Sequence, residues 1–304
     1  MFDKYKRMVA GIGHKTRQAD QPFDITELIL PRWICVCMND SQQSDAPRRI
    51  KSVQTASKIL ATIQRQSEPT FGDLCGDLDV SKGTVHTYLS TLEEEGFITK
   101  SGDHYCLGFR FVTMGETVRN ETELYRAGQV EVDKLAEQTS EYVHLTVTYC
   151  GKEVTIYESR GDNAVAMDYH LQMREAPQYL HCTSTGKAML GHFDEERVHD
   201  IIDEQGLIEQ TENTISDPDR LFRELKRIRE QGYAVNDEEE LRGMRSIGAP
   251  IRGVDGDVCG AVSVTAPTSR LSGERFQSEI PELVMQAANI IEVNLETTVF
   301  EPNH

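Results

Sequence analysis

The sequence has no long, uninterrupted apolar stretch. Its longest apolar run, residues 25–38, contains Pro31 and Arg32 and falls short of the roughly 20 residues that a membrane-spanning helix needs. The basic N-terminal segment has neither a continuous apolar core nor a small-residue cleavage site, so it is a poor secretory signal. These absences predict a cytoplasmic protein without a membrane span.

Cysteine pairs of the spacing used for redox or zinc chemistry are also missing. The seven cysteines are an odd number, scattered along the chain without a C-x-x-C pair, so a disulfide framework is not expected. The close pair Cys35 and Cys37 has no histidine nearby and differs from zinc-binding spacings. The sequence therefore predicts no metal site and no cofactor.

Basic residues are fewer than acidic residues, and this imbalance differs along the chain. The net charge is −18, yet residues 1–47 hold six basic and six acidic side chains, and residues 48–112 hold eight of each. The acidic excess thus lies entirely beyond residue 112. A neutral N-terminal domain can still present a basic face to DNA phosphates. The acidic remainder fits either a body that repels DNA non-specifically or a salt-rich cytoplasm.

With 304 residues, the chain is long enough for two domains and an extension. Residues 1–47 show no sustained periodicity and are predicted to form a mobile extension. From Val53 to Ile63 apolar residues recur at helical spacing. Thr70 can cap a second helix and Ser81 a third.

Two short strands follow, at residues 97–100 and 104–107, joined by Ser101-Gly102-Asp103. Three helices followed by a hairpin form the order of a winged helix-turn-helix, which we assign to residues 48–112. A single linker helix is predicted over 113–138.

Residues 139–304 are predicted to form the second domain. Its expected elements are two strand pairs and a helix from Pro218 to Gly232; the strands are residues 143–147, 154–157, 246–252 and 258–265. This order predicts an α+β chain of two domains in which helices pack on an antiparallel sheet.

The third helix is the candidate DNA-reading element. In a helix-turn-helix the second helix of the pair enters the major groove by its N-terminal residues, and this one begins SKGTVHTYLS. Its polar side chains could also be the solvated side of an amphipathic helix, but the surrounding capped helix and wing favour DNA binding. The predicted DNA contacts are Arg49, Ser81, Lys82, Thr84, His86, Thr87, Ser90 and Lys100.

Several motifs resemble the IclR family of transcription regulators over residues 50–300. In the first domain these are SVQTASKIL, VSKGTVHTYLSTLEEEGF and YCLGFRFVTMG. In the second they are LHCTSTGKAML and GYAVNDEEELRGMRSIGAPIRGVDGDVCGAVSVTAP. The resemblance implies a regulator, expected to be a repressor, that binds a two-fold symmetric operator as a homodimer or tetramer.

The resemblance also implies a GAF-like α/β domain that binds a small effector: an organic acid, a sugar derivative or an aromatic catabolite. The implied effector residues are Ser184, Thr185, Met189, Asn236, Ser246, Ser263 and Thr265. Two positions depart from the family pattern. Thr87 stands where arginine is frequent, and Asn236 where an acidic residue is frequent.

Other features of the second domain are expected to be structural. We interpret Glu238-Glu239-Glu240 as a solvated turn, Lys187 as a residue at a helix start, and His144, Cys182 and Cys259 as packing residues. The alternatives to a ligand-controlled regulator are a small-molecule enzyme with an accessory winged helix and a protein-binding module.

Overall fold

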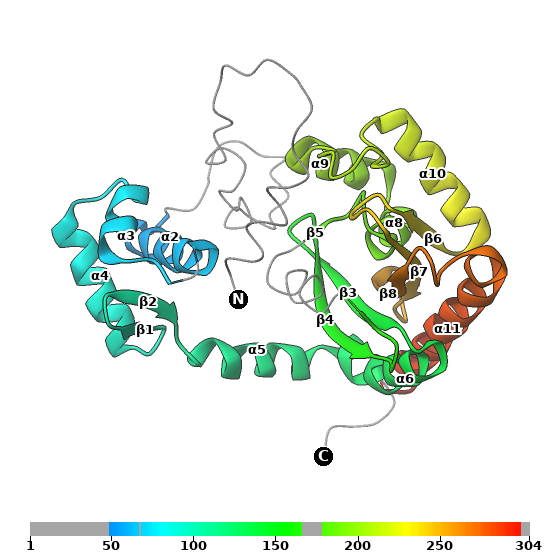
Figure 1. Cartoon of the computed structure of the whole chain (residues 1–304), viewed down its shortest axis with the longest axis horizontal. Coiled ribbons are helices and arrows are strands. Elements are labelled where there is room, and N and C mark those ends of the chain that lie inside the picture. The colour runs from blue at the N-terminus through cyan, green and yellow to red at the C-terminus, as the bar shows by residue number, and fades with distance from the viewer. Residues whose placement is uncertain (1–48, 67, 166–177, 299–304) are drawn as a thin grey trace. The chain divides into compact units, whose positions relative to one another are not determined.

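The structure is a computed structural model that describes residues 49–66, 68–165 and 178–298, drawn in Figure 1. The predicted mobile extension, residues 1–47, lies outside the described residues. Contacts divide the chain into two units, Met1–Ala61 and Thr62–His304, and the boundary falls within helix α2 (Lys51–Gln66).

The described part of the first unit is the start of α2. Ile59 is buried there, whereas Val53, which the sequence placed on the same inward stripe, is 63% exposed. The predicted apolar stripe is therefore correct at Ile59 and wrong at Val53, where the first turn of the helix faces solvent.

Helix α3 (Phe71–Asp77) begins at the predicted cap. The Thr70 side chain accepts a hydrogen bond from the backbone N–H of Asp73, and the Asp73 carboxylate accepts one from the backbone N–H of Thr70. This capping box satisfies N–H groups that have no partner within the helix. At the other end, Arg65 and Gln66 of α2 donate to Asp77 at 2.7 and 2.6 Å.

Helix α4 (Lys82–Glu94) is capped by Ser81 and buries Val85, Leu89 and Leu92. Gly96 ends it with a φ of +73°, a left-handed conformation that glycine adopts without strain. The hairpin follows as β1 (Ile98–Ser101) and β2 (His104–Leu107), paired antiparallel. The N-terminal domain is thus a winged helix, as predicted.

The predicted single linker helix is wrong, because the structure has two helices there. Helix α5 (Arg110–Glu121) and helix α6 (Glu123–Thr139) are separated by Thr122, whose backbone is extended at φ −75° and ψ 117°. The Thr122 hydroxyl donates to the carbonyl of Val118 at 2.8 Å. The two helices also differ in burial: α5 has no buried residue, whereas α6 contributes Leu124, Val132 and other residues to the core of the second domain.

The second domain is built on an antiparallel sheet with the strand order β5-β4-β3-β8-β7-β6. Its strands are β3 (Tyr142–Tyr149), β4 (Lys152–Arg160), β5 (Gln178–Tyr179), β6 (Ala234–Asp237), β7 (Met244–Arg252) and β8 (Val258–Pro267). Both predicted strand pairs are present, and β5 and β6 extend the sheet at its two edges.

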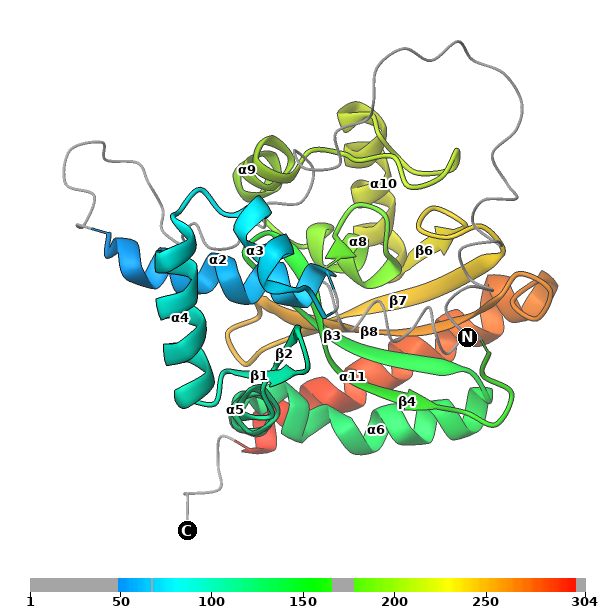
Figure 2. The ribbon, with the colours of Figure 1, turned by 60° about the vertical axis from the view of Figure 1, so that its left-hand side comes forward.

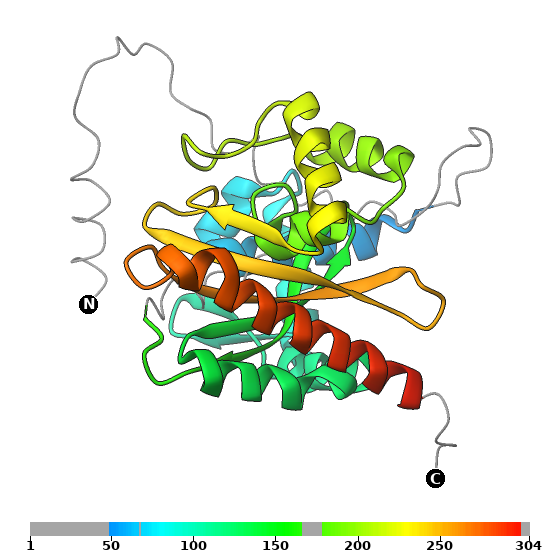
Figure 3. The ribbon, with the colours of Figure 1, turned by 90° about the vertical axis from the view of Figure 1, so that its right-hand side faces the viewer.

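Helices cover both faces of this sheet. On one face α6 and α11 (Ile280–Thr298) lie side by side, with α11 preceded by the short π-helical turn η2 (Arg275–Glu279) (Figure 3). On the opposite face lie α8 (Ser184–Leu190), α9 (Glu195–Gln205) and α10 (Pro218–Gln231) (Figure 2).

Polar and apolar side chains alternate along β7 and β8 and therefore lie on opposite faces of the sheet. Ile247, Val262 and Val264 join the apolar core beneath α6 and α11. Because neighbouring residues in a strand point to opposite faces, Ser246, Ser263 and Thr265 face the side of the sheet that α8 covers. That side carries the candidate site of this domain.

Candidate functional site

On α4, the structure places most of the residues predicted to contact DNA at the surface. Lys82, His86, Thr87 and Ser90 are exposed, while Thr84 is half-buried. The apolar side chains of the helix are directed inward, so the exposed set consists of hydrogen-bonding or charged groups. Such groups can contact phosphates and base edges.

Some of these groups already have roles in the fold. The Ser81 hydroxyl lies 2.8 Å from that of Thr84 and accepts the backbone N–H of Thr84 at 3.2 Å. The Thr87 hydroxyl donates to the carbonyl of Gly83 at 3.0 Å. Lys82 is the cation at the start of the helix, and it forms no ion pair with any described residue.

The remaining predicted DNA contacts lie outside α4. Arg49 is exposed and lies two positions before α2, in the unit Met1–Ala61. Lys100 is exposed on the hairpin, with its ammonium 5.4 Å from the centre of the Tyr105 ring.

In the second domain, predicted residues from β6, β7 and β8 form a row. Asn236 is paired with Ser246, and Ser246 with Thr265. Since adjacent strands lie about 4.8 Å apart, these three side chains span about 10 Å on one face. Ser263 lies in the next row, paired with Gly248.

The N-terminus of α8 rests directly on this part of the sheet. A Cβ atom at Gly248 would come within 2.8 Å of the backbone carbonyl carbon of Ser184 and of the nitrogen of Thr185. No larger residue fits without displacing α8. Gly248 thus lets Ser184 and Thr185 approach the row, and the six polar residues Ser184, Thr185, Asn236, Ser246, Ser263 and Thr265, here called the polar cluster, come together although they span 82 positions in the sequence.

All members of the polar cluster are buried, from 1% exposed at Ser184 to 6% at Thr265. The hydroxyls of Ser184, Ser246, Ser263 and Thr265 form no side-chain hydrogen bond with any residue that the structure describes. Asn236 uses its Oδ1 to accept the backbone N–H of Glu239 at 2.8 Å. Buried polar groups are normally hydrogen-bonded, so these hydroxyls are suited to a polar ligand.

Met189, predicted to give an apolar wall, is 1% exposed and belongs to the apolar cluster on the same side of the sheet, together with Ala234 and Ala261.

Thr185 differs from the rest of the polar cluster because its hydroxyl has a partner. Glu153, on β4, is 2% exposed, and its two carboxylate oxygens accept hydrogen bonds from Thr183 at 2.5 Å and from Thr185 at 2.7 Å. Burial raises the pKa of the Glu153 carboxyl, and the two threonine hydroxyls act in the opposite direction. The sequence analysis did not single out Glu153.

Two predictions about charged residues are wrong. Lys187 lies in the middle of α8, not at its start, and is fully buried. Its ammonium lies 2.5 Å from Oε1 of Glu239, which is 7% exposed. The run Glu238–Glu240 is therefore not simply a solvated turn. Lys187 and Glu239 are 52 positions apart, so only the fold reveals the pair.

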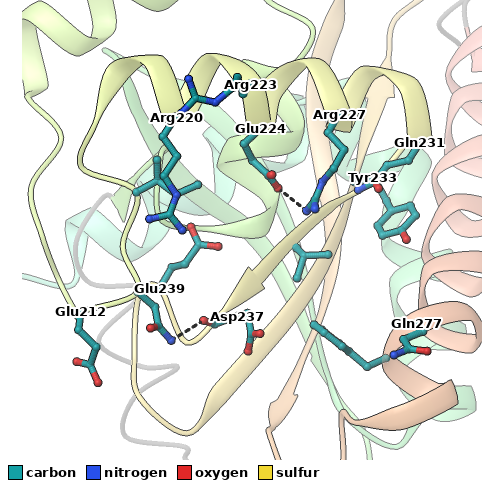
Figure 4. A pocket seen from close by; sticks show the side chains of 14 residues that line it. Glu212, Arg220, Arg223, Glu224, Arg227, Gln231, Tyr233, Asp237, Glu239 and Gln277 are labelled. Carbon is teal, nitrogen blue, oxygen red and sulfur yellow. Dashed lines mark hydrogen bonds and ion pairs between the residues drawn. The ribbon is translucent and has the colours of Figure 1, made fainter.

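An open groove of about 800 Å³ lies between α10 and the sheet edge at β6 (Figure 4). It does not include the polar cluster. Its charged residues are largely matched within the protein: Arg227 pairs with Glu224 at 2.9 Å, and Asp237 with Arg245 at 2.6 Å. We therefore place the candidate ligand site at the polar cluster and not in this groove.

His144 and Cys182 fit structural roles, whereas the predicted packing role of Cys259 is wrong, because that residue is exposed. His144 is buried and stacks on Tyr142 with ring centres 6.0 Å apart. Burial raises the pKa of the Cys182 thiol, and it raises that of Cys259 to about 11. Thiols of raised pKa are poor nucleophiles at neutral pH.

Among the described residues, no group of three or more His, Cys, Asp or Glu side chains could hold a metal ion. Within the same ranges, no helix is long and apolar enough to cross a membrane.

Known proteins match both halves of this chain. Residues 117–293 match the family described as bacterial transcriptional regulator IclR, C-terminal, and residues 54–99 match a winged helix-turn-helix DNA-binding family. The chain is 46% identical to the probable HTH-type transcriptional regulator ArcR of Halobacterium salinarum, over 85% of this chain and 98% of that protein.

Solved structures agree on the fold. The IclR protein of Thermotoga maritima superposes with a TM-score of 0.65 at 24% identity, over 81% of this chain and 99% of that one. An IclR homologue from Microbacterium hydrocarbonoxydans, solved with 4-hydroxybenzoate, has a TM-score of 0.69 at 19% identity, over 81% of this chain and 99% of that one. These relatives are regulators and not enzymes. The chain belongs to the IclR family of DNA-binding transcription regulators.

Proposed function

We propose that this protein binds a small polar metabolite at the polar cluster and changes its occupancy of an operator in response. The observation that carries the proposal is the gathering of four buried hydroxyls without described partners around Gly248. Each of these hydroxyls has a proton to donate and lone pairs that can accept hydrogen bonds from a ligand. A hydroxylated or otherwise polar ligand would supply the missing bonds, with Met189 contributing apolar contact.

We propose that α4 reads the operator from the major groove. Lys82 and His86 are exposed in its first two turns and would contact phosphates or base edges. Thr87 and Ser90 continue the same surface, and Ser81 and Thr84 would use the lone pairs that their capping bonds leave available. Arg49 and Lys100 would contact the flanking backbone.

A homodimer is the proposed assembly, with α5 as the contact between two copies of the chain. Met114 and Val118 lie one turn apart on α5 and are 43% and 67% exposed. An isolated helix of 12 residues is only marginally stable in water, so packing against a second α5 would stabilise it. A symmetric dimer would place two α4 helices on a two-fold symmetric operator.

We propose that the protein represses transcription from such an operator in the cytoplasm, and that the effector shifts the balance between bound and free states. By linkage, operator and effector must change each other's affinity by the same factor, typically about 5- to 150-fold.

The test is a footprint of the purified chain on the DNA upstream of its own gene, at several salt concentrations. The variant Lys82→Ala/His86→Ala should lose protection by at least about tenfold in affinity, and the Lys82 change should reduce the salt slope by about 1. Lys226→Ala on α10, also an exposed lysine, is the matched control and should protect normally. Equal protection by all three proteins would refute the assignment of α4.

A further inference from the structure

The α8 end of the polar cluster contains a buried acid with no described cationic partner. The Glu153 carboxylate accepts hydrogen bonds from the hydroxyls of Thr183 and Thr185, and it forms no ion pair with any residue that the structure describes. Glu153 is paired with Thr148 of β3, which fixes its backbone in the sheet. The negative charge is therefore held in place by the strand and by the start of α8.

These bonds determine what the threonines can offer to a ligand. A hydroxyl has one proton to donate and two lone pairs that accept. Thr183 donates its proton to Glu153 and also accepts the backbone N–H of Gly186 at 2.9 Å. Thr185 donates its proton to Glu153 as well. Toward a ligand, the Thr185 oxygen can therefore only accept a hydrogen bond.

Lys187, the buried lysine of α8, does not pair with Glu153. The Lys187 ammonium is paired with Glu239 Oε1 at 2.5 Å. The second oxygen of that carboxylate, Oε2, has no hydrogen-bond partner among the described residues. One ammonium and two carboxylates thus leave an excess of negative charge around the polar cluster, which would repel a ligand carboxylate.

The opposite end of the polar cluster is different. Ser246, Ser263 and Thr265 can donate or accept, and the Asn236 amide still has its two N–H donors, because only its oxygen accepts the Glu239 N–H. An uncharged ligand with several hydroxyls matches both ends, since its hydroxyls can donate to Thr185 and accept from Asn236.

We propose that Glu153 makes the polar cluster selective for an uncharged, polyhydroxylated compound of the sugar or polyol class, and against the carboxylate of the same carbon skeleton. This inference rests on the proposed function, because it assumes that the polar cluster is the effector site. Glu153 acts through Thr185 as a positioning residue for the ligand.

The test compares matched pairs of compounds that differ in charge: glycerol with glycerate, D-glucose with D-gluconate, and 4-hydroxybenzyl alcohol with 4-hydroxybenzoate. Affinities for the full chain are measured by calorimetry. In the pair that binds most tightly, the wild-type protein should prefer the uncharged compound by at least about tenfold.

Glu153→Gln should reduce that preference by at least about tenfold. The glutamine amide can accept from one threonine but must donate to the other, which frees a threonine proton to bind a ligand carboxylate and removes the negative charge. Glu196→Gln, which neutralises an exposed acid on α9, is the matched control and should leave the preference within about twofold of wild type.

A wild-type preference for the carboxylates, binding by no uncharged compound, or an unchanged preference in Glu153→Gln would each overturn the inference. The wild-type comparison needs no variant, so it stands even if Glu153→Gln folds poorly. Footprints of the same wild-type samples report operator binding separately. Lost DNA protection with retained ligand preference would refute the regulator proposal alone, whereas retained protection without the preference would refute only the role of Glu153.

Discussion

The buried pair of Lys187 and Glu239 gives a stringent test of the core on the α8 side of the sheet. The variant Lys187→Met keeps the length and apolar stem of the side chain but removes the ammonium. Glu239, 7% exposed, would then be a buried carboxylate without its cation. Breaking a buried pair from one side costs about 3–5 kcal/mol of unfolding free energy.

The double variant Lys187→Met/Glu239→Gln should recover most of that loss. Replacing both charges removes the desolvation penalty of each ion, and such replacements are often neutral or stabilising. A loss of about 4 kcal/mol should lower the melting temperature of a domain of this size by about 8–16 °C. The double variant should melt within about 4 °C of wild type, which corresponds to about 1–2 kcal/mol.

The assay is thermal and urea-induced unfolding of the full chain, followed by circular dichroism for the wild type, the two single variants and the double variant. Burial raises the pKa of Glu239 even with Lys187 present, so the lone carboxylate in Lys187→Met should take up a proton readily. The deficit of that variant should therefore shrink as the pH falls. A single variant as stable as wild type, or a deficit independent of pH, would refute the reasoning.

Three further predictions follow from other contacts. Gly248→Ala should displace α8, lower the unfolding free energy by about 1–3 kcal/mol and weaken ligand binding in calorimetry. The control Gly76→Ala, where the new Cβ would enter open space, should change neither stability nor binding. Equal behaviour of the two variants would contradict the close approach of α8 to Gly248. Because burial raises the pKa of Glu153 above its ordinary 4.5, the folded state binds the proton more tightly, and unfolding free energy should fall as the pH rises through that raised value. Urea titrations should show that the unfolding free energy of Glu153→Gln depends less on pH than that of the wild type. An unchanged slope would contradict the assignment of this pH dependence to Glu153. Val118→Asp should shift the mass measured by light scattering toward the monomer, because it places a charge on the exposed face of α5, where Val118 is 67% exposed. An unchanged mass would exclude α5 as the contact.

The winged helix could be predicted from the sequence because its signals are local. Thr70, Ser81 and Gly96 mark helix ends within a few residues of the bonds they make, and the apolar spacing of α4 identifies its buried face. The sequence does not reveal the break at Thr122, because threonine is tolerated inside helices and no glycine or proline marks the position.

The second domain was predictable in outline only. Residues of the polar cluster were identified through family resemblance, and their arrangement depends on strand pairing between distant segments. Helix α8 has only seven residues, all of them buried, so it lacks the polar and apolar alternation that predicts an amphipathic helix. Glu153 and Lys187 gain their environment from partners more than 30 positions away, which no local pattern reports.

The alternation of β7 and β8 has a consequence for how such a protein can change over evolution. Ser246 and Ile247 are neighbours in the chain, yet one belongs to the polar cluster and the other to the core beneath α6 and α11. Substitutions at every second position can therefore alter ligand preference while the opposite face keeps its packing. A new specificity can arise on such a sheet with little loss of stability, and directed mutagenesis for a biosensor should be confined to the face that α8 covers.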